Sequence, residues 1–110
     1  MDWIDEIELE LNRGREAKRV GNDGKTRAAA RRAVGIAVRA FQKRSGNKQY
    51  GDDSIGQLRG IAADQLLPGE VRDAATRLQA RISQEFTSPS RHPLVDAMVI
   101  IDFIRQTLTS

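Results

Sequence analysis

Apolar residues recur along this chain with the spacing of α-helices. The pattern begins near the N-terminus, where every fourth residue contributes to an apolar stripe: Trp3, Ile7 and Leu11. Asp2 can cap this helix, and Gly21 suits the left-handed conformation in which many helices end. We therefore expect a first helix over residues 2–20, weakened near its middle by Gly14, since glycine costs about 1 kcal/mol relative to alanine.

A second helix is predicted from Asn22 or Asp23 to Arg44. Its predicted buried face is largely alanine, so a neighbouring helix can approach closely and gain packing contacts. The residues on this face are Thr26, Ala30, Ala33, Val34, Ala37 and Phe41. The opposite side carries a row of cations, the basic stripe, formed by Lys25, Arg32, Arg39 and Lys43, with Arg27 and Arg31 on a flank.

Two shorter helices are expected after a loop over residues 45–52, which is rich in turn-forming residues. The first begins at Asp53 or Ser54 and continues until Pro68 stops it. Its apolar positions are Ile55, Leu58, Ile61, Ala62 and Leu66. The next helix extends to about Glu85, with a stripe of Val71, Ala74, Ala75, Leu78 and Ile82, and residues 87–93 form the longest irregular connection.

The last predicted helix, from about Pro93 to Leu108, is apolar nearly all the way round. Such a helix needs cover on more than one side, so it is either the central element of the fold or part of a dimer seam. No segment alternates with the period of two that strands require, apart from a short Val-Ile-Ile run inside this helix. The fold class is therefore all-α, a compact antiparallel bundle of four to five helices in a single domain over residues 1–110.

Composition excludes several kinds of chemistry. The chain has no cysteine, which excludes disulfides, thiolate catalysis and Cys-ligated metal sites, and its one histidine, His92, excludes multi-histidine sites. We expect neither a metal nor a cofactor. The acidic N-terminus is unlike a signal peptide, and no apolar run approaches the roughly 20 residues of a membrane span. A soluble, cytoplasmic protein with no membrane contact is expected.

Charge is distributed unevenly along the chain. Residues 1–12 contain five acids and no base, whereas residues 13–48 contain twelve Lys or Arg and two acids. Residues 49–110 are slightly acidic, and the whole chain has a net charge of +3. The basic segment can meet an anion such as nucleic acid, or it can be neutralised by the acidic first helix of the same fold.

Gly24-Lys25-Thr26 matches the end of the phosphate-binding signature G-x-x-x-x-G-K-[ST]. The first glycine of that signature is missing, because Arg19 occupies its position, and the preceding segment is helical where the motif requires a strand. We therefore interpret the match as a helix start. The remaining function for this segment is binding of a bare anion at the helix N-terminus, with Lys25 nearby.

Arg91 and His92 are the candidate catalytic residues, because they precede the last helix and histidine exchanges protons near neutral pH. The alternative is a loop histidine without a catalytic role. Two carboxylates on the last helix, Asp96 and Asp102, project in different directions and form no acid–base pair. We expect one of them to meet a cation of the second helix, either Arg27 or Arg31.

The basic stripe, Lys25, Arg32, Arg39 and Lys43, could follow a phosphate backbone. Tyr50 is the one aromatic residue near it along the chain, so the sequence offers no stacking platform for bases, and no helix-turn-helix spacing is evident. Any nucleic-acid binding through this stripe is expected to have little sequence preference.

An acidic first helix is followed in this chain by the segment G-N-D-G-K-x-R-A-A-A-R-R-A-x-G-I-A at 21–37 and by an apolar last helix after Arg-His-Pro. In these features the chain resembles small bacterial proteins of the HEPN superfamily. The resemblance implies an antiparallel helical bundle. Many members dimerise, partner a minimal nucleotidyltransferase, or act as RNases through an Arg and a His four to six residues apart. Here Arg91 directly precedes His92 and residues 85–87 are Glu-Phe-Thr, so the RNase pattern is not met.

Three hypotheses for function remain open. The first is a non-catalytic HEPN-like interaction module that forms a homodimer through its last helix or binds a partner protein. The alternative is nonspecific nucleic-acid binding through the basic stripe, which would weaken steeply with salt. The third is a degenerate RNase that uses Arg91 and His92, in which His92→Ala would abolish activity without lowering stability.

Overall fold

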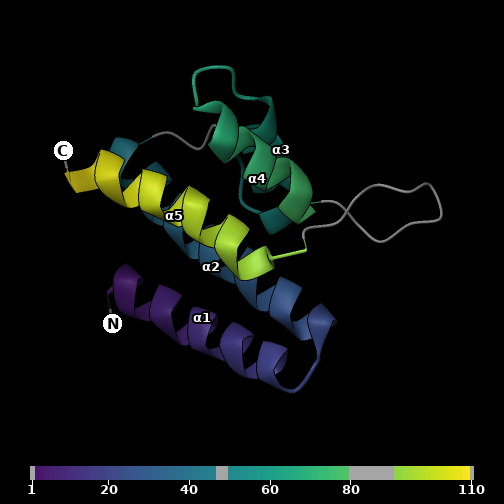
Figure 1. Ribbon diagram of the computed structural model, residues 1–110. Helices are drawn as coiled ribbons and strands as arrows, with labels where there is room; N and C mark the ends of the chain where they lie inside the picture. The colour runs from purple at the N-terminus through teal and green to yellow at the C-terminus, as the bar shows by residue number, and fades with distance from the viewer. Residues whose placement is uncertain (1, 47–49, 80–90, 110) are drawn as a thin grey trace.

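The computed structural model describes residues 2–46, 50–79 and 91–109, and these ranges contain five helices and no strand. The helices are α1 (Trp3–Arg19), α2 (Asp23–Ser45), α3 (Ser54–Ala63), α4 (Gly69–Gln79) and α5 (Pro93–Thr109), as Figure 1 shows. The all-α fold class predicted from the hydrophobic spacing is confirmed. None of these helices is both long and apolar enough to cross a lipid bilayer.

Local side chains determine where the first helices begin and end. The Asp2 carboxylate accepts the N–H of Ile4 at 2.6 Å, and the Asn22 side chain accepts the N–H of Lys25 at 3.1 Å. Each bond satisfies a backbone donor that has no partner inside its helix. Gly21 and Gly46 follow α1 and α2 with φ angles of +77° and +71°, the left-handed region that glycine enters without strain.

The helices are arranged in two groups around α2 (Figure 1). α1 and α2 form an antiparallel hairpin, and α5 lies along α2 in the same direction, because the α3–α4 pair carries the chain back before α5 begins. Residues at the end of α1, the start of α2 and the start of α5 therefore meet at one end of the molecule. At the opposite end, Trp3 of α1 and Leu108 of α5 border the same hollow.

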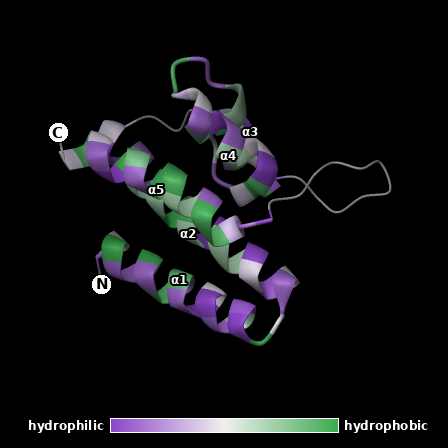
Figure 2. Ribbon diagram, in the orientation of Figure 1, coloured by the Kyte–Doolittle hydropathy of each residue, from purple (hydrophilic) through white to green (hydrophobic). Residues whose placement is uncertain are grey.

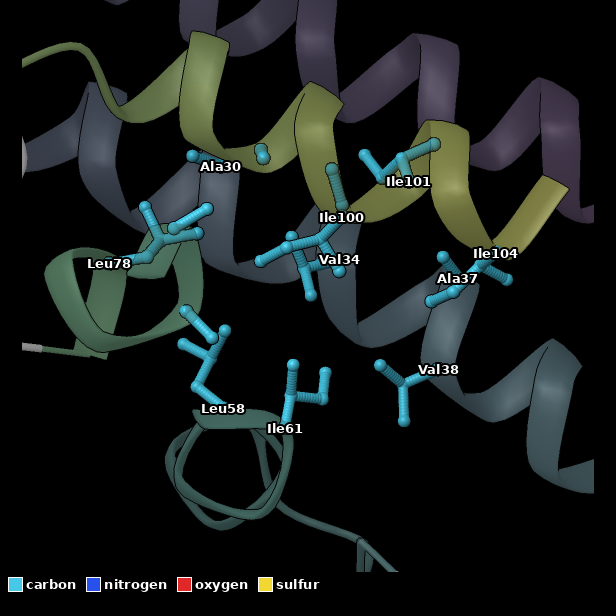
Figure 3. Close-up of a cluster of buried hydrophobic side chains, with 14 of the residues drawn as sticks. Ala30, Val34, Ala37, Val38, Leu58, Ile61, Leu78, Ile100, Ile101 and Ile104 are labelled. Carbon is cyan, nitrogen blue, oxygen red and sulfur yellow. The ribbon is translucent and has the colours of Figure 1, made fainter. Parts of the chain in front are cut away.

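The core lies between α2, α5 and the α3–α4 pair, where side chains from all four helices point toward one another (Figure 3). The alanine face of α2 is buried as predicted, since Ala30, Ala33, Val34 and Ala37 are each 0% exposed. Phe41, on the same predicted face, is only partly buried and packs against the core. The small alanines bring α2 close to its neighbours, and the larger aliphatic residues of the other helices fill the core.

α5 is the most hydrophobic of the long helices, whereas α1 is largely hydrophilic (Figure 2). Ala97, Ile100 and Ile101 of α5 are buried against the rest of the core, and five more apolar side chains are partly buried there: Leu94, Met98, Val99, Phe103 and Leu108. Val95 is the one large apolar residue of α5 that is exposed, at 60%. The sequence left two explanations for the apolar surface of α5, a central place in the fold or a dimer seam. Packing within a single chain covers most of this surface.

α3 ends earlier than predicted. It stops at Ala63, five residues before Pro68, and Leu66 is 94% exposed where the apolar spacing predicted a buried position. The Asp64 side chain accepts the N–H of Leu66 at 3.0 Å, which turns the chain away from the helix. Leu67 packs against the core in place of Leu66. Ile82 and Glu85, predicted to belong to the following helix, lie outside the described residues.

Gly14 is a packing position rather than a weak point of α1. A Cβ atom at this residue would lie 2.7 Å from Cδ2 of Leu94 and 3.3 Å from Cβ of Ala29. α1, α2 and α5 therefore converge where α1 has no side chain. The helix-propensity cost predicted for glycine is offset by the close approach that it permits.

Tyr50 links the loop before α3 to the end of that helix, and this link predicts an acid-dependent loss of stability. Its hydroxyl donates to Asp64 at 2.5 Å, and this bond, with a smaller contribution from the Leu66 N–H, lowers the pKa of the Asp64 carboxyl. A carboxyl whose pKa is lower in the folded protein than in the unfolded chain adds stability at any pH above its unfolded-state pKa of about 4. This added stability is lost as the pH falls through the pKa of the folded state. Tyr50→Phe should therefore be more destabilising at pH 7 than at pH 3, measured by urea unfolding.

The matched control is Tyr50→Phe made in an Asp64→Asn background. An amide cannot lose a proton in this pH range, so the tyrosine substitution should then have the same effect at both pH values. If Tyr50→Phe has equal effects at pH 7 and pH 3 in the otherwise wild-type protein, the hydroxyl does not stabilise the Asp64 carboxylate.

Candidate functional site

The four cations of the basic stripe, Lys25, Arg32, Arg39 and Lys43, are all exposed on α2. Arg32 is nevertheless paired, because its Nε donates to Oε2 of Glu10 on α1 at 2.9 Å. The Glu10 side chain is only 11% exposed and also accepts from Arg13 at 2.7 Å. The acidic first helix therefore neutralises part of the stripe within the fold.

The stripe also divides between two hollows. Lys25 and Arg32 border an open groove of about 700 Å³ between α1 and α2, which we call the α1–α2 groove. Its apolar floor and sides are formed by Leu9, Ala17, Val20, Ala28 and Ala29. Arg39 and Lys43 border a separate hollow of about 650 Å³ at the other end of α2. The row of cations that α2 presents is thus not one continuous track.

The aromatic residue beside the stripe is Trp3, not Tyr50. Trp3 borders the second hollow together with Arg39, Lys43 and Arg44, whereas Tyr50 packs against the core and binds Asp64. Sequence distance suggested Tyr50, because Trp3 precedes the stripe by more than twenty residues. The antiparallel α1–α2 hairpin brings Trp3 next to the end of α2.

Arg91 and His92 meet two further cations in what we call the junction pocket. This pocket of about 300 Å³ is formed where α1 ends and where α2 and α5 begin. Its charged and titratable lining residues in the described part of the chain are Lys18, Asp23, Arg27, Arg91 and His92. The His92 carbonyl accepts the N–H of Asp96 at 3.0 Å, so His92 occupies the position just before α5.

Arg27 has the one buried polar side-chain atom without a hydrogen-bond partner among the described residues of the junction pocket. Its Nε is buried and has no hydrogen-bond partner in the structure. Sequence reasoning placed Arg27 on the flank of α2 and expected it to pair with a carboxylate of the last helix, but the structure shows no such pair for it. Its guanidinium instead contributes positive charge to the pocket shared with Arg91 and His92.

Asp96 of α5 is held by Arg77 of α4, a partner that the sequence did not indicate. Both of its carboxylate oxygens accept from the Arg77 guanidinium, at 2.8 and 3.2 Å. This hydrogen bonding raises the pKa of Arg77. Arg31 of α2, the expected partner, donates its Nε to the Leu78 carbonyl at 2.8 Å, and Asp102 is exposed. The Arg77–Asp96 pair lies between two core helices and serves the fold.

The Gly24-Lys25-Thr26 segment forms the first turn of α2, as the interpretation of a helix start requires. The Lys25 N–H is already bound by Asn22, and the Thr26 hydroxyl donates to the Asn22 carbonyl at 2.9 Å. A helix, α1, precedes this turn instead of a strand. The backbone amide that an anion beside Lys25 would use is therefore occupied by the cap.

No family model, curated protein or solved structure matches this chain. Within residues 2–46, 50–79 and 91–109, no three His, Asp or Glu side chains come together in a group that could hold a metal ion. The α1–α2 groove is apolar with a cationic rim, and the junction pocket is cationic.

Proposed function

We propose that this protein is a non-catalytic, HEPN-like interaction module, and that its α1–α2 groove binds an acidic amphipathic helix of a partner protein. This proposal rests on two exposed apolar side chains, Leu9 and Val20. They are 45% and 61% exposed, and they account for two of the four exposed large apolar side chains in the described residues. Both line the same groove, about three helical turns apart. Exposed apolar side chains that cluster in one groove are typical of interaction surfaces.

The charge of the rim supports an acidic occupant. Arg13 and Arg32 border the groove with side chains that are 65% and 53% exposed, and they share a single carboxylate, Glu10, so together they keep a net positive charge. Lys25 is exposed beside them and has no ion-pair partner among the described residues. The acid on the rim, Glu16, is paired with Arg19. A partner helix with one apolar face and acidic edges would bury its apolar face against Leu9 and Val20. Its acidic residues would then lie near the cations of the rim.

The alternative is nonspecific nucleic-acid binding through the basic stripe, which is supported by Trp3 beside Arg39, Lys43 and Arg44. Homodimerisation through α5 has less support, since Val95 is the one exposed large apolar residue of that helix. A cytoplasmic location belongs to the proposal and accords with the absence of cysteine.

Site-specific photo-crosslinking in the native cells tests the groove. A benzophenone amino acid at position 9 or 20 should give a discrete adduct with one other protein, whereas the same group at position 66 should not. Leu66 is the matched control because it is 94% exposed and lies away from the groove. The crosslinked partner would then be purified, and its affinity would be measured by calorimetry.

Leu9→Glu and Lys25→Glu should each lower the affinity for that partner at least tenfold, and Leu66→Glu should leave the affinity unchanged. Equal adducts from all three positions, or an affinity that these groove variants do not alter, would refute the proposal. Adducts of the chain with itself, together with a dimer by light scattering, would identify a second copy as the occupant and would also refute it. Salt-sensitive binding of oligonucleotides that is lost in Trp3→Ala would favour the alternative.

A further inference from the structure

The junction pocket has more positive than negative charge. Lys18, Arg27 and Arg91 line it together with a single carboxylate, Asp23. None of these four side chains forms an ion pair within the part of the chain that the structure describes. Three cations in one concave site, with one acid between them, produce a positive potential that favours an anion.

Arg27 supplies a second observation, independent of the net charge. Its buried Nε lacks an acceptor, and a buried donor without a partner is costly to the folded state. A guanidinium has five N–H donors in a fixed plane, which suits it to bind two oxygen atoms of one anion. Because Arg27 lines the junction pocket, an anion bound there would lie beside a guanidinium that the fold leaves short of acceptors.

The start of α5 adds backbone donors to the same pocket. Pro93 has no N–H, and the N–H of Asp96 binds the carbonyl of His92, the residue just before α5. The N–H groups of Leu94 and Val95 precede that of Asp96 and have no acceptor among the described residues, and both residues line the pocket. The helix dipole adds partial positive charge at this end of the seventeen-residue helix.

We propose that the junction pocket binds the phosphate group of a small phosphate monoester. Phosphate suits it better than a carboxylate does, because its double charge and three terminal oxygens match three cations and the N–H groups of Leu94 and Val95. A volume of about 300 Å³ exceeds what inorganic phosphate fills and is at the lower end of small-molecule sites. The apolar walls formed by Pro93, Leu94 and Val95 would contact the organic part of the ligand.

The test is a calorimetric titration of the full chain with AMP, inorganic phosphate and adenosine. AMP should bind more tightly than inorganic phosphate, and adenosine should not bind. In a parallel NMR titration with AMP, the amide signals of Leu94 and Val95 should shift. Arg27→Met and Arg91→Gln should each lower the affinity for AMP by about tenfold or more, because a hydrogen bond to a charged group is lost.

Arg59→Gln is the matched control, because Arg59 is an exposed cation of α3 outside the pocket, and it should leave AMP binding unchanged. Arg91 is itself exposed, so its substitution keeps the test valid if Arg27→Met fails to fold. The proposal is wrong if AMP does not bind, or if its affinity is the same in the two pocket variants as in wild type. It is also wrong if oligonucleotides without a terminal phosphate bind at the pocket with an affinity that grows with length, since the site would then bind a nucleic-acid backbone.

This proposal is independent of the partner-binding function. The junction pocket and the α1–α2 groove have no lining residue in common among those described. Leu9→Glu, which should weaken binding of the partner protein at least tenfold, is therefore expected to leave AMP affinity unchanged. Loss of AMP binding in Arg91→Gln with partner binding retained would separate the two sites.

Discussion

Ile100→Ala is expected to lower the free energy of unfolding by about 2–5 kcal/mol. Ile100 is 0% exposed and belongs to the cluster in which α5 meets Val34 of α2, Leu58 of α3 and Leu78 of α4 (Figure 3). Removing its larger aliphatic groups leaves a cavity that four helices cannot close without moving together. A domain of this size has a total stability of about 5–15 kcal/mol, so the loss should be a large part of it.

Val95→Ala is the matched control, because it also shortens a β-branched residue of α5 but at a position that is 60% exposed. Its effect should stay within about 0.5 kcal/mol. Urea unfolding at neutral pH measures both variants. Similar losses for the two would mean that α5 does not turn the Ile100 face toward the core, and the arrangement of the helices would then be wrong.

The helices of the N-terminal half could be predicted because their signals are local. Asn22 caps α2 and Gly21 permits the turn before it, and both effects act within a few residues of the chain. The alanine face of α2 was predicted equally well, because burial of one helix face follows from its own periodicity. Sequence patterns are sufficient where a residue's environment is determined by its near neighbours.

The end of α3 shows where local reasoning failed. Apolar spacing and Pro68 favoured a longer helix, but the Asp64 side chain binds the backbone of Leu66 and is itself held by Tyr50, fourteen residues earlier. The competing hydrogen bond depends on a loop that folds back onto the helix end. Periodicity contains no information about such a contact.

The junction pocket could be predicted only in part. Arg91 and His92 were selected as candidates for their chemistry, but Lys18 and Arg27 join them because α5 runs alongside α2 in the same direction. That direction depends on how the α3–α4 pair returns the chain, which is a property of the whole fold. A signal was nevertheless present in the sequence, because Arg27 lies on the flank of α2 between its buried and basic faces.

Ala37→Leu is expected to destabilise the fold by about 1–3 kcal/mol through overpacking, and Ala33→Leu should have a similar effect. Ala37 is 0% exposed and belongs to the same buried cluster as Ile101 and Ile104 of α5 (Figure 3). Leucine is a good helix former, so any loss must come from packing and not from helix propensity. Thermal melts should show a midpoint lower by roughly 4 °C for each kcal/mol lost.

Ala63→Leu provides the comparison, because it makes the same change at an exposed position at the end of α3 and should leave the melting temperature nearly unchanged. Wild-type melting of the Ala33 and Ala37 variants would mean that α2 does not bury its alanine face. The two core variants change the side-chain volume of the core in opposite directions, and both should lower the stability. Ile100→Ala should destabilise the fold because the core loses volume, and Ala37→Leu because the core gains volume. A core that tolerated both changes would lack the close packing that α2 requires.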